Sequence, residues 1–193
     1  MKNIAKEILA EAKFGTLALS HDNKPYSLPI NFVQLDGNIY FHGSKKGRKI
    51  NAIQNNQLAS FSVVESCSII DSDFSTTDNL ACPATHFFKS VLIDGRIEFV
   101  EEYDEKVLML SSFMKKLQPK GGHKPLSDRV YKKAINATLI YKLVPDEIST
   151  KLKFGQKLTK ERFDMIIKNL KTRDKPKDAE TIKLMIEHFG KQK

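Results

Sequence analysis

The sequence has no tryptophan, only two cysteines and no long hydrophobic run. Cys67 and Cys82 are too few for a disulfide framework or a zinc site, so we expect no bound metal. No uncharged apolar stretch approaches the roughly 18 residues that a membrane span needs. The N-terminal segment carries acidic residues and lacks the apolar core of a signal peptide. Together these absences favour a cytoplasmic protein.

Arginine is also scarce, since only 5 of the 32 cationic residues are arginine. The net charge of +9 is unevenly distributed: residues 1–150 carry +2 and residues 151–193 carry +7. A nucleic-acid-binding protein can be basic in this way. However, the aromatic residues are not interspersed with the basic ones, and the cations are mostly lysine. We therefore interpret the basic tail as a solubilising surface, and we do not expect nucleic acid as a partner.

The apolar pattern predicts a mainly β protein of the α+β class. Short strands joined by tight turns indicate a small closed antiparallel barrel of six strands, because alternating βα units are missing. Asp22-Asn23 and Asp36-Gly37 are expected turns. A break or bulge is expected at Asp94-Gly95, and residues 65–84 read as a long polar loop. The expected strands are 15–20, 25–35, 38–42, 58–64, 87–100 and 137–144, and the expected helices of this part include 48–54, 104–117 and 127–134.

The chain after about residue 155 has a different pattern. Apolar residues recur at helical spacing behind Thr159 and again behind Asp178, and both of these residues are expected N-caps. The two segments predict a helical hairpin that packs on the barrel or on a partner subunit. We therefore expect a barrel domain over residues 1–155 and a C-terminal helical extension over residues 156–193.

Residues 39–53, IYFHGSKKGRKINAI, form the most informative segment. A short strand leads into a loop with two glycines and four cations, and a helix follows. Gly43 and Gly47 allow backbone N–H groups to approach an anion, and the new helix N-terminus adds unpaired donors. Arg48 can bind two oxygens at once. The pattern therefore predicts a phosphate site, although a solvated basic loop has the same composition.

Two nucleotide-binding motifs are missing. The chain contains no GxGxxG, which disfavours a Rossmann dinucleotide site. The loop GSKKGRK has the wrong spacing for a Walker A motif and lacks the Ser or Thr after the lysine. Nucleotide hydrolysis is therefore disfavoured.

Three segments together resemble the FMN-binding split-barrel family of pyridoxamine 5′-phosphate oxidase-related proteins. They are FGTLAL followed by PYSLPINF (residues 14–19 and 25–32), the segment 39–53, and CPATHFFKSVLIDGRIEFV (residues 82–100). The match runs in order across roughly residues 10–117. Within the family, the chain is most similar to the nitroimidazole-resistance (Nim-type) reductases. The resemblance implies a six-stranded antiparallel split β-barrel with peripheral helices, which binds FMN at a homodimer interface.

The resemblance also implies roles for particular residues. One strand segment flanks the flavin ring through its backbone, a turn meets the flavin, a basic pair binds the phosphate, and a Ser-Val pair approaches from another strand. In that order, the residues are Pro29, Ile30 and Asn31; His42, Gly43 and Ser44; Arg48 and Lys49; and Ser90 and Val91. His42 is the candidate catalytic residue, as a hydrogen-bonding group or proton donor. A histidine satisfied by a backbone neighbour is the alternative.

The chain departs from the family in two places. Phe88-Lys89 stands where the family often has tyrosine before its basic residue, and the C-terminal arginine, histidine and tryptophan signature of true pyridoxamine 5′-phosphate oxidases is missing. Vitamin B6 oxidation is therefore disfavoured. The resemblance favours a flavoprotein that reduces a small organic substrate such as a nitroaromatic compound. A flavin- or haem-binding module without turnover is the alternative, because this barrel hosts several cofactors.

Overall fold

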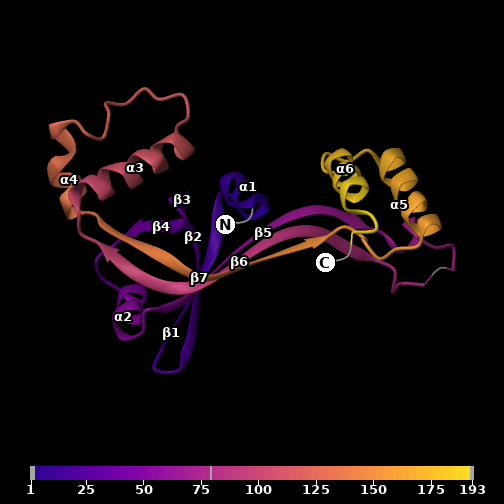
Figure 1. Ribbon diagram of the computed structural model, residues 1–193, viewed down its shortest axis with the longest axis horizontal. Helices are drawn as coiled ribbons and strands as arrows, with labels where there is room; N and C mark the ends of the chain where they lie inside the picture. Colours follow the sequence, from indigo (N-terminus) through magenta and orange to yellow (C-terminus); the bar gives the residue numbers. More distant parts are fainter. Residues whose placement is uncertain (1–2, 79, 192–193) are drawn as a thin grey trace. The chain divides into compact units, whose positions relative to one another are not determined.

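The computed structural model of the protein describes residues 3–78 and 80–191. The chain divides into two compact units: Met1–Val63 with Val91–Ser149, and Val64–Ser90 with Thr150–Lys193. Figure 1 traces the chain through both. Within the described ranges, none of the helices combines the length and the apolar character that crossing a bilayer requires.

Seven strands form one sheet in the order β2-β1-β5-β6-β7-β4-β3. Where strand pairs are resolved, as between β1 and β2 and between β4 and β7, they are antiparallel. The predicted fold class is confirmed, with one strand more than expected. The strands are β1 (Phe14–His21), β2 (Lys24–Asn31), β3 (Val33–Leu35), β4 (Asn38–Gly43), β5 (Leu58–Ile70), β6 (Thr85–Val100) and β7 (Leu139–Lys153).

The extra strand arises at Phe32. The predicted strand 25–35 is divided there into β2 and β3, which belong to opposite ends of the strand order. The Phe32 side chain is fully buried and packs edge-on against Phe61, with ring centroids 4.9 Å apart. Apolar residues continue on both sides of Phe32, so the sequence pattern did not reveal the change of pairing partner.

The two predicted tight turns are confirmed by their backbone angles. Asp22 and Asn23 have φ values of 50° and 58°, and Asp36 and Gly37 have values of 48° and 87°. Two consecutive left-handed residues match the right-handed twist of the flanking strands. These turns join β1 to β2 and β3 to β4 in register, with His21 opposite Lys24 and Leu35 opposite Asn38.

The core of the first unit collects alternate residues from the strands. Leu17, Phe41, Phe61, Ile93 and Tyr141 are fully buried in it or nearly so, together with apolar residues of α1 (Asn3–Glu11) and α2 (Arg48–Asn55). This alternation leaves the other strand face outward, as in a curled sheet. A second cluster joins α3 (Tyr103–Leu117) to β3 and β4 through residues that include Met109, Phe113 and Tyr40. The short helices η2 (Arg129–Tyr131) and α4 (Lys132–Ala137) lead into β7.

The second unit contains the predicted helical hairpin, α5 (Lys160–Arg173) and α6 (Asp178–His188), and the turn η1 (Ser72–Phe74). Its core includes Phe74, Phe87, Phe154, Ile166 and Met185. The Thr159 side chain accepts a hydrogen bond from the Arg162 N–H, so the predicted N-cap is confirmed.

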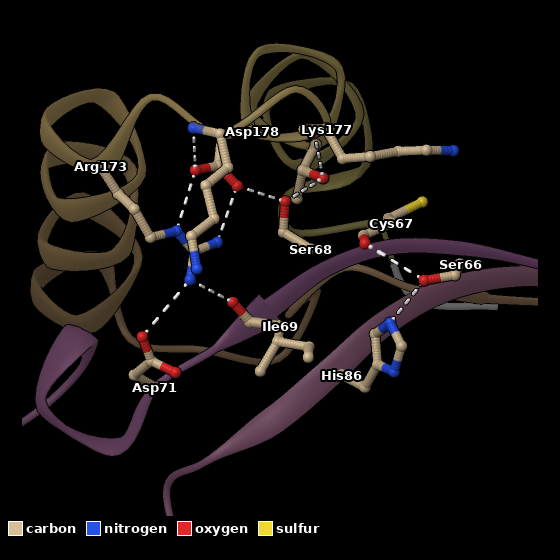
Figure 2. A network of polar contacts seen from close by, with 11 residues as sticks. Ser66, Cys67, Ser68, Ile69, Asp71, His86, Arg173, Lys177 and Asp178 are labelled. Atoms are coloured by element: carbon tan, nitrogen blue, oxygen red, sulfur yellow. Dashed lines mark hydrogen bonds and ion pairs between the residues drawn. The ribbon is translucent and has the colours of Figure 1, made fainter.

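The prediction that Asp178 is an N-cap is wrong, because Asp178 is the first residue of α6 and Lys177 precedes it as the cap. The buried Asp178 carboxylate instead accepts hydrogen bonds from Arg173 at 2.7 and 2.9 Å and from Ser68 Oγ at 2.6 Å (Figure 2). Arg173 also donates to the carbonyl oxygen of Ile69. The carboxylate therefore holds the start of α6 to the end of α5 and to β5.

Two further expectations are wrong. The first residues of the predicted loop 65–84 are strand in the structure, because β5 continues to Ile70. There Cys67 and Ser68 are buried against the core and helices of the second unit. The predicted break at Asp94-Gly95 does not occur, since β6 is continuous from Thr85 to Val100. A Cβ atom at Gly95 would clash with the carbonyl oxygen of Val144. This glycine therefore permits a close approach of two strands and does not end one.

Candidate functional site

The predicted phosphate loop lies between β4 and α2. His42 and Gly43 end β4, where they pair with Ile140 and Leu139 of β7. Gly47 precedes α2 with φ of +110°, a conformation that L side chains rarely adopt. No side chain among the described residues caps this helix. The first N–H groups of α2 are therefore open to an anion, as the sequence predicts.

Lys49 turns its ammonium group back over the end of β4. Its Nζ lies 5.1 Å from the centre of the Tyr141 ring, and a Cβ atom added to Gly43 would lie only 2.7 Å from it. Gly43 therefore leaves room for this charge. Burial lowers the pKa of Lys49 below its ordinary value. A bound anion would offset that cost of burial.

Arg48 faces a different aromatic residue. Its guanidinium carbon lies 4.3 Å from the centre of the Tyr26 ring, which belongs to β2. Stacking on an aromatic face leaves the N–H groups at the guanidinium edge available for two oxygens of one phosphate. The two cations that the sequence predicted as a pair are thus held by two tyrosines from different strands.

Tyr141 presents a buried hydroxyl with no hydrogen-bond partner among the described residues. Its side chain is fully buried, and its ring stacks on Phe41 at 5.3 Å. Burial, with a smaller contribution from Tyr26, raises the pKa of Tyr141 far above its ordinary value, so the phenol keeps its proton. An unpaired buried hydroxyl is costly. The hydroxyl has almost no exposed surface, so a ligand oxygen can reach it only if the side chains over it move. The two cations over the Tyr26 and Tyr141 rings are the groups that fit a phosphate-bearing cofactor.

His42 packs edge-on against Phe113 of α3, with ring centroids 4.7 Å apart, and keeps part of its side chain exposed. Burial of the ring lowers the pKa of His42 below its ordinary value, and the charge of Lys49 lowers it further. The imidazole is therefore neutral at pH 7 and can donate one hydrogen bond and accept another.

The predicted flavin-flanking segment ends β2. Pro29, Ile30 and Asn31 pair with Thr16, Gly15 and Phe14 of β1. The Asn31 side-chain amide donates to the carbonyl oxygen of Lys13 at 3.1 Å, while Ile30 packs against the core. The segment lies on the strand that also carries Tyr26, the contact of Arg48.

The remaining predicted site residues lie on two parts of the chain, Ser44 in the loop after β4 and Ser90 and Val91 on β6. Ser44 Oγ accepts a hydrogen bond from the Lys46 N–H at 3.2 Å, which shapes the loop. Val91 is 1% exposed and belongs to the barrel core, so only its backbone can face a ligand. Ser90 precedes it on β6 and belongs to the second unit, where its role stays a prediction.

Tyr26, Tyr141 and Phe113 were not predicted as site residues. Tyr26 is part of the segment PYSLPINF that carries the resemblance, so a signal for it was present. Tyr141 and Phe113 read as ordinary apolar positions of a strand and a helix. Their contacts with Lys49 and His42 depend on long-range pairing, and no local pattern indicates them.

A family model described as pyridoxamine 5′-phosphate oxidase matches residues 2–152. No curated protein matches the chain. The structure of the flavocytochrome Anf3 from Azotobacter vinelandii is similar at 25% identity and a TM-score of 0.66, over 83% of this chain and 71% of that one.

Two further solved structures share the fold at lower identity. One is a protein from Bacteroides thetaiotaomicron assigned to 5-nitroimidazole antibiotic resistance, with 18% identity, a TM-score of 0.62, and coverage of 78% of this chain and 82% of that one. The other is an FAD- and haem-binding protein from Mycobacterium smegmatis, with 21% identity, a TM-score of 0.64, and coverage of 80% and 72%.

Proposed function

The chain belongs to the pyridoxamine 5′-phosphate oxidase family, and from this premise we propose that it binds FMN non-covalently at the basic loop. The observation that carries the proposal is the cluster of Arg48, Lys49 and the unpaired Tyr141 hydroxyl around the start of α2. A phosphate monoester carries about −1.5 to −2 charges at pH 7. Two cations, open helix amides and one phenol are suited to neutralise and bind it.

We further propose that the strand ends around this loop hold the flavin ring. Pro29, Ile30 and Asn31 would flank the ring through their backbone, with His42, Gly43 and Ser44 at the turn beside it. Ser90 and Val91 would approach from β6, with Val91 contributing its backbone because its side chain lies in the core. In this proposal residues 1–155 form the FMN-binding domain, and residues 156–193, of which 192 and 193 lie outside the described residues, form an extension.

The proposed activity is the reduction of a small organic substrate, with a nitroaromatic compound as the example. The resistance-related protein from Bacteroides thetaiotaomicron shares the fold and supports this choice of substrate class. When bound, the flavin supplies two-electron chemistry, and the protein supplies binding and orientation. His42 is neutral at pH 7 by its lowered pKa, so its proposed role is to orient a substrate or flavin atom by a hydrogen bond.

We also propose that the protein is a homodimer with FMN at the interface. Exposed apolar side chains on the outward strand face, Leu58 at 53% and Leu92 at 43% exposure, favour a protein contact there. Single exposed apolar residues are common, so the pair supports the proposal only together with the family's dimeric architecture.

A second candidate is a flavin- or haem-binding module without turnover. It is favoured by the similarity to a flavocytochrome and to an FAD- and haem-binding protein. In that case the same barrel would store or relay electrons and would not convert a small substrate.

The absorption spectrum of the protein as purified separates these candidates. Bound FMN gives the two flavin bands, released intact on denaturation, whereas haem gives a Soret band and a deazaflavin a single band at shorter wavelength. Anaerobic reduction followed by addition of a nitroaromatic compound then tests turnover. Rapid reoxidation supports the enzyme, and a reduced flavin that ignores the compound supports the module. A colourless protein that does not take up FMN would overturn the proposal.

A further inference from the structure

A small pocket of about 270 Å³ lies beside the basic loop in the first unit. Five segments line it: the loop itself, α2, the end of β6, α3, and the stretch from α4 into β7. Ligand pockets for drug-sized molecules begin at about 300 Å³. This pocket is therefore suited to a small molecule of a single ring or a short chain.

Lys106 is one of the residues that line the pocket, and it is largely buried. Its side chain is only 8% exposed, although lysine is almost never fully buried without a partner. Within residues 3–78 and 80–191, its one ion pair is with Glu101 at 3.9 Å, and that carboxylate is 79% exposed. This separation exceeds a hydrogen bond. Because an ammonium group has three donors, Lys106 keeps donor capacity for a ligand in the pocket.

The charges around the pocket select the kind of ligand. Lys45 and Lys106 line it together with one acid, Glu101, which leaves one net positive charge among the lining residues. This net positive charge favours an anion in the pocket, and Glu101 weakens the binding of any anion placed there. The side-chain amides of Gln54 and Asn136 add neutral donors.

Three apolar residues, Ile50, Phe99 and Leu139, line the rest of the wall together with Thr138. Phe99 and Leu139 pack against the barrel core, and Ile50 is 4% exposed. These side chains are held in place by the fold and offer a preformed surface to an aromatic or aliphatic group. A ligand with one charged end and one apolar end matches both parts of the wall.

We propose that this pocket binds a small organic carboxylate, with the carboxylate on Lys106 and the apolar body against Phe99, Ile50 and Leu139. The site is distinct from the proposed flavin phosphate site, because Arg48 and Lys49 face Tyr26 and Tyr141 and do not line this pocket. The inference therefore does not rest on flavin binding.

Titration of the full-length protein with sodium benzoate, followed by amide chemical shifts in NMR spectra, tests the proposal. Saturable shifts are expected at residues 99–106 and 136–139. The K106M variant, in which methionine can fill the buried site, is expected to bind benzoate at least about tenfold more weakly. K133M removes an exposed lysine of α4 that does not line the pocket, and it should bind like the wild type.

The E101Q variant should change the benzoate affinity in the opposite direction to K106M. It therefore still tests the proposal if K106M does not fold. Removal of the competing acid is expected to tighten benzoate binding several-fold, while inorganic phosphate should bind the wild-type pocket more weakly than benzoate. Benzoate binding that does not saturate, or that is unchanged in E101Q, would overturn the proposal. Equal loss in K106M and K133M would show unspecific attraction to a basic protein and would overturn it too.

Discussion

At the scale of single residues, two neighbouring cations behave differently because their surroundings differ. Arg48 is exposed and stacks on Tyr26, whereas Lys49 is half-buried over Tyr141, and burial lowers its pKa. The Tyr141 hydroxyl beside Lys49 has no partner among the described residues. A buried polar group without a partner reduces stability, and in our proposal a ligand oxygen supplies the missing partner.

The Y141F variant tests this explanation. Removal of an unpaired buried hydroxyl should raise the free energy of unfolding of the cofactor-free protein by up to roughly 1–3 kcal/mol. The same change should weaken FMN binding by about tenfold, because one hydrogen bond is lost. Chemical denaturation and flavin fluorescence titration measure the two effects.

Y40F is the matched control for Y141F. The Tyr40 hydroxyl donates to Glu105 at 2.8 Å and is also buried. Its loss should lower the stability and leave FMN affinity unchanged. A Y141F protein that is less stable than wild type, or that binds FMN equally well, would contradict the role given to this hydroxyl.

His42 gives a second prediction at this scale. Burial lowers its pKa and Lys49 lowers it further, so K49M should move the His42 pKa up toward its ordinary value, while K46M should leave it in place. The pKa of His42 is lower in the folded state than in the unfolded state. The stability linked to its titration is therefore present above the unfolded-state pKa and is lost as the pH falls through the folded-state pKa. NMR titration of the imidazole checks the shift, and an unchanged pKa in K49M would refute the coupling.

At the scale of elements, the sequence predicted most where local chemistry decides the outcome. The αL turns at Asp22-Asn23 and Asp36-Gly37, the start of α2 behind Gly47 and the cap at Thr159 all follow from residue types. The polar segment after Val64 was predicted as loop, yet β5 continues because α6 buries Ser68 there through Asp178 and Thr181. Such tertiary burial overrides local propensity.

The α5–α6 junction yields a prediction about the Asp178 carboxylate. Its bonds to Arg173, Ser68 and the Lys175 N–H hold its pKa well below the ordinary range. D178N should lower the free energy of unfolding by roughly 3–5 kcal/mol, because it removes the buried carboxylate that holds the largely buried Arg173 charge and leaves that charge only its 3.4 Å pair with the exposed Asp71. Hydrogen exchange should increase throughout α5 and α6.

D174N is the control, since Asp174 is exposed in a left-handed conformation that asparagine tolerates. The pH dependence has a defined sign. The stability that Asp178 supplies is present above its unfolded pKa of about 3.9 and is lost as pH falls below it. D178N should therefore lose less stability between pH 5 and pH 2 than the wild type. A D178N protein as stable as D174N would contradict the account of this junction.

At the scale of the whole molecule, the proposed homodimer makes a prediction about the outward face of β6. Replacement of Leu92, which is 43% exposed, by aspartate should shift the protein from dimer to monomer and reduce FMN binding, because the interface would complete the site. L108D changes a leucine of α3 that is 50% exposed and should leave the dimer intact. Sedimentation equilibrium measures both, and a monomeric wild type that binds FMN would contradict the proposal.

The central claim is that the basic loop binds the phosphate of FMN. Titration of the cofactor-free protein with FMN and with riboflavin, which lacks only the phosphate, tests it most directly. The wild type should prefer FMN by about 100-fold or more, since each charge-assisted hydrogen bond contributes roughly 1.5–3 kcal/mol. K49M should lose most of that preference, and K46M, an exposed lysine of the same loop, should keep it. Equal affinity of the wild type for FMN and riboflavin would contradict the account.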